Sequence, residues 1–435
     1  MRGIVANDVT GGDRSELTLT MKGPTMDLTP HPEAAGFDNE RLARIDEHFR
    51  TAYVESGKIA GYQIAVGRRG HLAYRSTVGT MDLETGAALD DQTIWRLYSM
   101  SKPITGVALL SLMERAKVKL NDPIHRFLPE WRDAKVSVKR SDGSVELVAA
   151  EQPISVKHAL MHMTGIGVGP PEARLNLEAL VEGGGARSLD PSATLADLSR
   201  LLATEPLWFQ PGAHWYYSWS SDICARLVEV IADEPFGDYL KRAIFDPLGM
   251  VDTGFHVPES EADRVPSLYA RTATKEVRLL DDRAKKRTTR VPALQSGGGG
   301  LLGSLDDYVR FASALTAGGT ADGPRVLSRP TIELMRTNHL PGGASLRDFA
   351  MPGGYGEVGF DGNGFGLQVA VGLGQAETAG VGPAGDFMWG GAASTAFWVD
   401  PTEDLFAVFM SQLIPSGAFD FRGQLRSLVY AAITD

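Results

Sequence analysis

Segments with strand-like patterning lie near both ends of this chain, and helical patterning dominates between them. Apolar runs around a short turn predict a hairpin at 62–78. Three further strands and a closing helix are predicted at 364–373, 394–399, 404–411 and 418–432. Between 155 and 250 the apolar residues recur mostly at helical spacing. This order predicts an α/β (α+β) fold, in which both ends of the chain build one sheet and a mostly helical segment is inserted.

Capping residues and turn residues place further elements. Asp38 precedes apolar residues at helical spacing and predicts the start of a helix. Ser304 likewise predicts the start of a helix at about 305–317. A second hairpin is predicted at 135–148, because Ser-Asp-Gly lies at its centre.

The composition is that of an ordinary globular protein and excludes several classes. The 435 residues have a formal net charge of −11, and 43% of them are hydrophobic. The acidic balance argues against a binder of nucleic acid or of anionic membranes, which needs a clustered basic face. No run approaches the ~18 apolar residues of a membrane-spanning helix. The one cysteine, Cys224, excludes an internal disulfide and a thiolate metal cluster. We expect no metal and no cofactor.

Residues 1–30 are rich in Gly, Asp, Thr and Pro, and they lack the apolar stretch of a secretory signal. We therefore predict a flexible leader or an added extension there, with the cytoplasm as the default location. The expected partner is a small-molecule substrate rather than nucleic acid or a membrane. The sequence is silent on oligomeric state.

Three motifs of known functional sites are incomplete or absent in this sequence. Residues 298–303 have G-x-G-x-x-G spacing, but without the strand and βαβ unit of a dinucleotide site, so a tight turn into a helix is favoured. His158 and His162 lie four residues apart, but no Glu lies between them as in the zinc motif H-E-x-x-H. No serine lies in G-x-S-x-G, which weakens an α/β-hydrolase interpretation.

The S-x-x-K sequence from Ser99 to Lys102 has the most informative context. Pro103 follows it, and proline is well tolerated in a helix only in the first turn. A helix through 104–115 must therefore begin near Ser99, which places the hydroxyl at the positive end of the helix dipole. Lys102 then lies on the same face one turn away. A nucleophilic serine needs a nearby base and a positive field. The plainer alternative is a capping serine beside a solvated lysine.

Two other segments have compositions that suit a ligand site. An aromatic stretch at 208–219 precedes a predicted helix, and it either forms core or lines an apolar pocket with one phenol facing the serine. Residues 389–392 (WGGA) precede the strand predicted at 394–399. Two glycines there allow close backbone approach and leave N–H groups for a ligand. Taken alone, each segment is more often structural than functional.

Five segments together resemble the serine β-lactamase and penicillin-binding-protein superfamily, most closely its class C-like carboxylesterases, the family VIII esterases. The likeness runs from about residue 36 to the C-terminus. The segment with Ser99 and Lys102 resembles the first motif. The other four matches, in family order, are 160–166 (LMHMTGI), 211–218 (PGAHWYYS), 297–301 (GGGGL) and 389–391 (WGG).

The resemblance implies an antiparallel sheet flanked by helices. It implies that residues 31–105 and 290–435 form an α/β domain, that residues 106–289 form a mostly helical domain, and that the active site lies between the two. These boundaries come from the resemblance and not from the pattern of the residues.

The resemblance also implies roles for individual residues. Ser99 would attack an ester carbonyl, Lys102 would help to deprotonate it, and Tyr217 would be the general base or a relay. A free phenol titrates near ~10, so Tyr217 can act near neutral pH only if a cation such as Lys102 lowers its pKa. The backbone N–H groups of Ser99 and Ala392 would form the oxyanion hole.

Two departures from the relatives that act on β-lactams bear on the substrate. Trp219 stands where those relatives have the Asn of Tyr-x-Asn, and Trp389 stands where they have a lysine that helps to hold the substrate carboxylate. The indoles remove anchors for an anionic β-lactam and suit a neutral, apolar ester. Trp219, Trp389, Gly390 and Gly391 are therefore expected to contact the substrate.

The sequence thus predicts a serine carboxylesterase that hydrolyses small, short-acyl esters through an acyl-enzyme on Ser99. The alternatives are a β-lactamase or D,D-peptidase, an acyltransferase, and a catalytically silent binding protein on the same scaffold. Ser221-Asp222 partly matches the Ser-Asp-Asn motif of more distant relatives, but Ile223 departs from it, so Tyr217 is preferred.

Overall fold

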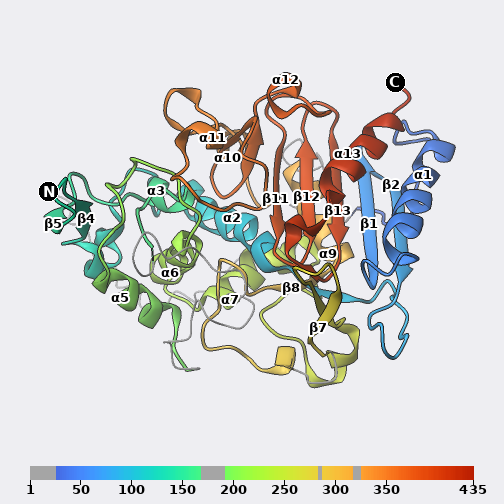
Figure 1. The fold of residues 1–435 in the computed structure, drawn as a ribbon, viewed down its shortest axis with the longest axis horizontal. Helices are drawn as coiled ribbons and strands as arrows, with labels where there is room; N and C mark the ends of the chain where they lie inside the picture. Colours follow the sequence, from blue (N-terminus) through green and yellow to red (C-terminus); the bar gives the residue numbers. More distant parts are fainter. Residues whose placement is uncertain (1–25, 168–191, 283–286, 317–324) are drawn as a thin grey trace, which may run out of the picture.

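The computed structural model describes residues 26–167, 192–282, 287–316 and 325–435 (Figure 1). The leader predicted at 1–30 therefore lies almost wholly outside the described residues. A seven-stranded sheet has the order β2-β1-β13-β12-β11-β10-β9, and each neighbouring pair is antiparallel. Its strands are β1 (Gly61–Arg68), β2 (His71–Gly79), β9 (Asn363–Phe365), β10 (Ala370–Gly372), β11 (Phe387–Gly391), β12 (Thr395–Asp400) and β13 (Leu405–Met410). Both ends of the chain thus contribute to one sheet, as predicted.

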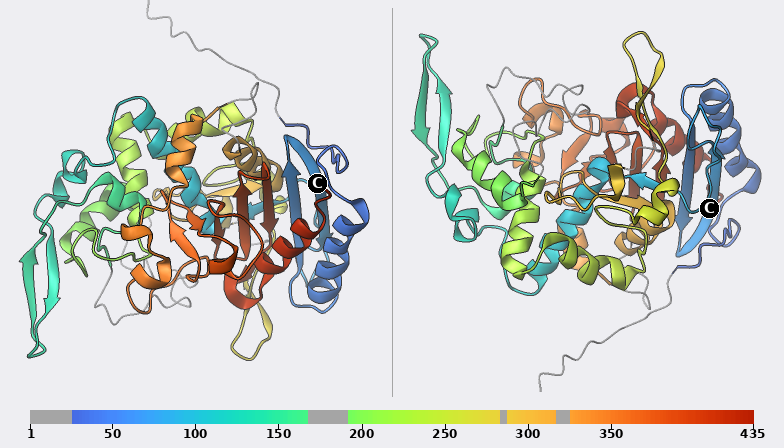
Figure 2. Two further views of the ribbon diagram at one scale, coloured as in Figure 1. Left: turned by 90° about the horizontal axis from the view of Figure 1, so that it is seen from above. Right: turned by 90° about the horizontal axis from the view of Figure 1, so that it is seen from below.

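Helices cover both faces of the sheet (Figures 1 and 2). They are α1 (Asn39–Phe49), α2 (Ser101–Glu114), α9 (Leu305–Leu315) and α13 (Phe421–Ala431). Helices α1 and α13 share one core cluster with Ile64 and Phe409 of the sheet, whereas α2 and α9 share another with Phe397 and Val408. Because both faces are covered, β1, β12 and β13 are buried at every position instead of alternating.

Both predicted helix starts are confirmed. The Asp38 side chain accepts a hydrogen bond of 3.0 Å from the Arg41 N–H at the start of α1. The Ser304 side chain accepts one of 3.3 Å from the Asp307 N–H at the start of α9. Each cap satisfies a backbone donor that the first turn of a helix leaves free.

In the described chain between α2 and α9, helical residues outnumber strand residues. Its helices are α3 (Val156–Leu160), α5 (Leu195–Thr204), α6 (Ser220–Ala232), α7 (Phe236–Leu240) and α8 (Asp246–Leu248). Its strands are β4 (Lys135–Lys139), β5 (Val145–Ala149), β6 (Leu268–Arg271), β7 (Val277–Asp281) and β8 (Leu302–Ser304). The β4–β5 hairpin is the one predicted at 135–148, and it projects from the body in Figure 2.

Short elements complete the fold. They are β3 (Ile94–Arg96), β14 (Leu413–Ile414), α10 (Arg329–Met335), α11 (Leu346–Phe349) and α12 (Gln375–Thr378). Strand β3 pairs with β8, and β14 extends the β6–β7 hairpin, which the sequence did not predict. The borders at 105/106 and 289/290 stay a prediction. Within the described ranges, no helix is both long and apolar enough to cross a membrane.

One strand prediction near the C-terminus is wrong in detail. The single strand predicted at 364–373 is the pair β9 and β10, because Gln368 adopts a left-handed φ of 68° and the chain turns there. The Gln368 side chain is buried, accepts from Ser221 Oγ at 2.6 Å and donates to the Leu160 carbonyl. The WGG segment lies inside β11, a strand that the sequence analysis did not predict, and precedes β12 as expected.

Candidate active site

Ser99 lies in a single 3-10 turn, Tyr98–Met100, that leads directly into α2. Helix α2 begins at Ser101, so Pro103 falls in its first turn, as the sequence predicted. Tyr98 adopts a left-handed φ of 47°, a conformation that costs roughly 1–2 kcal/mol for a residue with a side chain. The turn presents Ser99 at the N-terminal end of the helix with 9% of its surface exposed.

Lys102 of α2 contacts the Ser99 hydroxyl. Its Nζ lies 3.1 Å from Ser99 Oγ and also donates to the Gly298 carbonyl. Burial lowers the pKa of Lys102 to about 8, although the carboxylates of Asp222 and Glu357 oppose this change. A substantial fraction of Lys102 is therefore neutral just above neutral pH.

Tyr217 reaches the same oxygen from a distant part of the chain. Its hydroxyl donates a hydrogen bond of 2.6 Å to Ser99 Oγ, and Lys102 Nζ lies 4.5 Å from its ring centroid. The sequence analysis required a cation to lower the pKa of Tyr217, and here the structure differs. Burial, reinforced by the Glu357 carboxylate, raises that pKa well above its ordinary value. The phenol is therefore protonated in the resting site.

The Gly-rich turn at 297–301 holds Lys102 in place. Asp222 is buried and accepts hydrogen bonds from Ser296 Oγ at 2.6 Å and from the Gly298 N–H at 3.3 Å. A Cβ at Gly297 would lie 2.7 Å from the Cβ of Ala225, so helix α6 packs directly on this turn. Asp222 thus fixes the carbonyl that binds Lys102, a role that the partial Ser-Asp-Asn match did not suggest.

Ser221, the alternative to Tyr217 as the general base, has other hydrogen-bond partners than Ser99. Its Oγ donates to Gln368 at 2.6 Å and lies 3.3 Å from His162 Nε2. The structure therefore brings Tyr217, and not Ser221, to Ser99.

The end of β11 lies against the turn that carries Ser99. A Cβ at Gly391 would lie 2.4 Å from the Leu97 carbonyl oxygen, and Thr395 Oγ1 donates to the same oxygen at 3.3 Å. Only glycine allows this approach of β11 to the Leu97 carbonyl, and Ala392 is the next residue of the chain. Gly390 is also crowded, because its missing Cβ would overlap the Arg422 guanidinium.

The two tryptophans expected to contact the substrate are placed differently. Trp389 is buried, and its ring centroid lies 5.4 Å from that of Tyr217. Its indole N–H lowers the pKa of Tyr217 but has no hydrogen-bond partner of normal geometry among the described residues. Trp219 is half-buried at the N-terminus of α6, and the contacts of the described residues do not connect it to Ser99 or Tyr217.

The two histidines have structural surroundings. Helix α3 ends before His162, so the pair does not share one helix face. His158 Nδ1 accepts from the Ser155 N–H and completes the cap of α3. Burial lowers the pKa of His162 well below its ordinary value, and its ring lies 5.0 Å from that of Tyr217. In the described part of the chain, no group of three His, Cys, Asp or Glu side chains is placed to hold a metal.

Glu357 is a buried carboxylate near the site that the sequence analysis missed. It accepts hydrogen bonds from the Tyr355 hydroxyl at 2.9 Å and from Ser416 Oγ at 2.7 Å, and it pairs with Arg422 at 3.2 Å. These residues come from a loop, a short turn and α13. No local spacing pattern joins them, so the sequence offered no signal.

Ser99 lies in the turn before a buried helix, and both the lysine one turn on and a phenol contact its oxygen. This arrangement on the antiparallel sheet defines a β-lactamase-like serine hydrolase. The sequence pattern of the Beta-lactamase family matches residues 46–431, and the chain belongs to this family. The resemblance and the hydrolase class inferred from the sequence are thus confirmed.

Relatives agree with this placement. The chain is 31% identical to Protein Rv1367c of Mycobacterium tuberculosis, over 84% of this chain and 89% of that protein. It is 30% identical to Esterase EstB of Burkholderia gladioli, over 92% of this chain and 98% of EstB. The structure of EstCE1, described as a hydrolase with promiscuous acyltransferase activity, superposes with a TM-score of 0.73 at 25% identity, covering 90% of this chain and 99% of EstCE1.

Proposed function

We propose that this protein is a serine carboxylesterase, which hydrolyses small, short-acyl esters through an acyl-enzyme on Ser99. One observation carries the proposal: Lys102 Nζ and the Tyr217 hydroxyl lie 3.1 Å and 2.6 Å from Ser99 Oγ. A serine hydroxyl that contacts two side chains able to transfer protons is suited to nucleophilic catalysis. The similarity to Esterase EstB supports esters as the substrate class.

In the first half-reaction, neutral Lys102 accepts the proton of Ser99 while Oγ attacks the ester carbonyl carbon. The bond to the alcohol oxygen then breaks, and that oxygen takes a proton from the Tyr217 hydroxyl while Lys102 returns one to the phenol. The pKa of Lys102, about 8, suits a base that works slightly above neutral pH. Tyr217 has a raised pKa, which suits a relay and not a resting-state base.

In the second half-reaction, a water molecule gives a proton to neutral Lys102 while its oxygen attacks the acyl carbon. The Ser99–acyl bond then breaks, Ser99 Oγ takes the proton back from Lys102, and the acid leaves. Both half-reactions develop negative charge on the carbonyl oxygen. We assign its stabilisation to the backbone N–H groups of Ser99 and Ala392, and the close approach of Gly391 to the Leu97 carbonyl supports this assignment. One such donor is typically worth ~10²–10³ in rate.

The substrate preference rests on Trp389. This indole fills the position beside Tyr217 and has no charge to pair with a substrate carboxylate. A neutral ester therefore fits better than an anionic β-lactam. We propose Trp389 and the backbone of Gly390 and Gly391 as substrate contacts. For Trp219, only the sequence departure from Tyr-x-Asn supports such a role.

A substrate panel tests the proposal. p-Nitrophenyl esters of rising acyl length are compared with nitrocefin, on the wild type and on Ser99→Ala. We expect fastest turnover of the acetate or butyrate ester, slow or no turnover of nitrocefin, and no activity in Ser99→Ala with unchanged circular dichroism. Nitrocefin turnover faster than that of the butyrate ester would favour a β-lactamase.

Acyl transfer is the second candidate. The similarity to EstCE1, which is described as having promiscuous acyltransferase activity, supports it. The same acyl-enzyme would react with an alcohol or amine in place of water. Adding an alcohol acceptor to the ester assay and measuring the transfer product by mass spectrometry distinguishes the two activities.

A further inference from the structure

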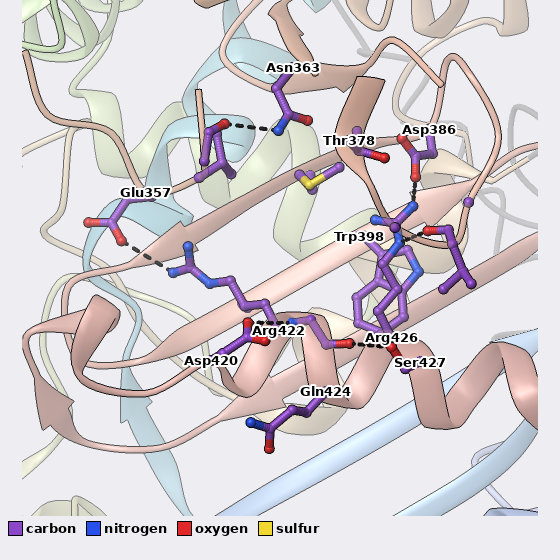
Figure 3. A pocket seen from close by; sticks show the side chains of 18 of the residues that line it. Glu357, Asn363, Thr378, Asp386, Trp398, Asp420, Arg422, Gln424, Arg426 and Ser427 are labelled. Carbon is purple, nitrogen blue, oxygen red and sulfur yellow. Dashed lines mark hydrogen bonds and ion pairs between the residues drawn. The ribbon is translucent and has the colours of Figure 1, made fainter. Parts of the chain in front are cut away.

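A cavity of about 1020 Å³ lies beside α13, β11 and β12, and Ser99 is not among its lining residues (Figure 3). Two ion pairs stand on its wall, Glu357 with Arg422 and Asp386 with Arg426. They are chemically alike, because each joins a carboxylate less than 3% exposed to an arginine of α13. A carboxylate is buried in this way only with partners.

The Glu357 pair connects to the catalytic residues. Glu357 accepts the hydroxyl of Tyr355 at 2.9 Å, and the ring centroid of Tyr355 lies 6.0 Å from that of Tyr217. The contacts of the described residues make no such connection from Asp386 to Tyr217. The second ion pair is therefore a natural control for the first.

The charge of Glu357 is only partly compensated. Arg422 reaches it through one nitrogen at 3.2 Å, and 29% of the Arg422 side chain is exposed. The uncompensated negative charge of Glu357 therefore acts on Lys102 and Tyr217, and it raises the pKa of both side chains.

Other groups face the same pair. Asp222 of α6 also raises the pKa of Lys102, and Tyr355 also raises the pKa of Tyr217. Burial keeps the His162 ring neutral. Asp222 and Glu357 thus act on Lys102 from different elements. Only Glu357 also acts on Tyr217 through its charge and through a side chain in contact with that ring.

We propose that Glu357 is a positioning residue for this reaction: it anchors Tyr355 against Tyr217 and supplies the negative charge behind Tyr217 and Lys102. The inference rests on the proposed function, since it concerns the same proton transfers. The structure supplies two separable parts, a hydrogen bond to Tyr355 and a charge.

The charge is tested by Glu357→Gln, with Asp386→Asn as the matched control. The readout is the pH dependence of kcat/KM for p-nitrophenyl acetate, with thermal melting to follow folding. Removal of the Glu357 charge lets Lys102 lose its proton more easily, so the acid limb should move to lower pH. The relative rate below the limb should rise about tenfold for each pH unit that the limb moves. In Asp386→Asn the limb should stay in place even if the protein melts earlier.

Two further variants keep the inference testable if Glu357→Gln does not fold. Arg422→Gln leaves the carboxylate less compensated and should move the limb to higher pH. Tyr355→Phe keeps the charge and loses the hydrogen bond, so kcat should fall without movement of the limb. The inference is overturned if the acid limb of the pH profile does not move in Glu357→Gln. If Glu357→Gln does not fold, an unmoved acid limb in Arg422→Gln overturns it. If wild-type hydrolysis is absent or persists in Ser99→Ala, the proposed function itself fails.

Discussion

The hydroxyl of Tyr217 donates a hydrogen bond of 2.6 Å to Oγ of Ser99, 118 residues earlier in the chain. This contact joins the aromatic segment before α6 to the turn before α2. It gives the nucleophile a second proton-transfer partner besides Lys102, which belongs to its own helix. The predictions for Tyr217, Lys102 and Gly391 depend on this three-residue arrangement and on the backbone that supports it, whereas that for Asp307 concerns the stability of the fold.

Tyr217→Phe removes the hydroxyl and keeps the ring, which stacks on Trp215 at 6.1 Å. We expect kcat for p-nitrophenyl butyrate to fall on the order of 10²–10⁴-fold, the usual contribution of a positioned acid–base group. Circular dichroism should be unchanged, because the aromatic packing remains. Near-native turnover would move the relay role to another group, of which Ser221 is the first to test.

The rate should rise with pH through a midpoint of about 8. The reason is that protonated Lys102 cannot accept the Ser99 proton, and its pKa is lowered to about 8 by burial. The check is kcat/KM from pH 6 to pH 9.5. Lys102→Arg is the control, because a guanidinium stays protonated throughout this range and should be inactive at every pH. A flat wild-type profile would exclude Lys102 as the base.

Gly391→Ala should cost activity and stability together. The added Cβ would lie 2.4 Å from the Leu97 carbonyl and would push β11 away from the turn that carries Ser99. Overpacking of this kind costs roughly 1–3 kcal/mol. Gly359→Ala is the matched control, because its added Cβ meets no atom within 4 Å. Urea melts and ester assays on both variants check this, and equal behaviour of the two would contradict the packing argument.

Asp307 should make stability fall as pH rises between about 4 and 6. It is buried, accepts from the Asp252 N–H and from Thr253 Oγ1, each at 2.7 Å, and burial raises its pKa from 3.8 to about 6. The folded state therefore holds a proton that the unfolded state releases at lower pH, so folding is penalised once both are ionised.

The penalty is about 3 kcal/mol above pH 6, since one pKa unit is worth ~1.4 kcal/mol. Asp307→Asn should remove this part of the pH dependence while its amide oxygen still accepts the two hydrogen bonds. Urea melts at pH 4.5, 6 and 7.5 compare the two proteins. Parallel pH dependences would show that Asp307 is not the group responsible.

Local spacing explains which parts of the site could be predicted. Ser99 and Lys102 lie one helical turn apart, and Pro103 marks the first turn of the helix, so their contact could be read from the sequence. Tyr217 required the order of several motifs, because nothing local links it to Ser99. Glu357 could not be predicted, since its partners come from elements that only the fold brings together.

Most of the fold followed from apolar patterning and caps, as at Asp38 and Ser304. The errors lie where backbone conformation departs from the pattern. Gln368 breaks an apolar run into β9 and β10 through a left-handed φ, which the side chain types did not reveal. Strand β11, which contains WGG, was not predicted, and its Gly391 is required by close packing on the Leu97 carbonyl.

The most direct test of the central claim is to locate the covalent intermediate. The protein is reacted with a fluorophosphonate probe, digested, and mapped by peptide mass spectrometry, and loss of esterase activity is followed in parallel. The account predicts one label, on Ser99, that appears at the rate at which activity is lost and is absent from Ser99→Ala. A label on another residue, or full esterase activity in Ser99→Ala, would contradict it.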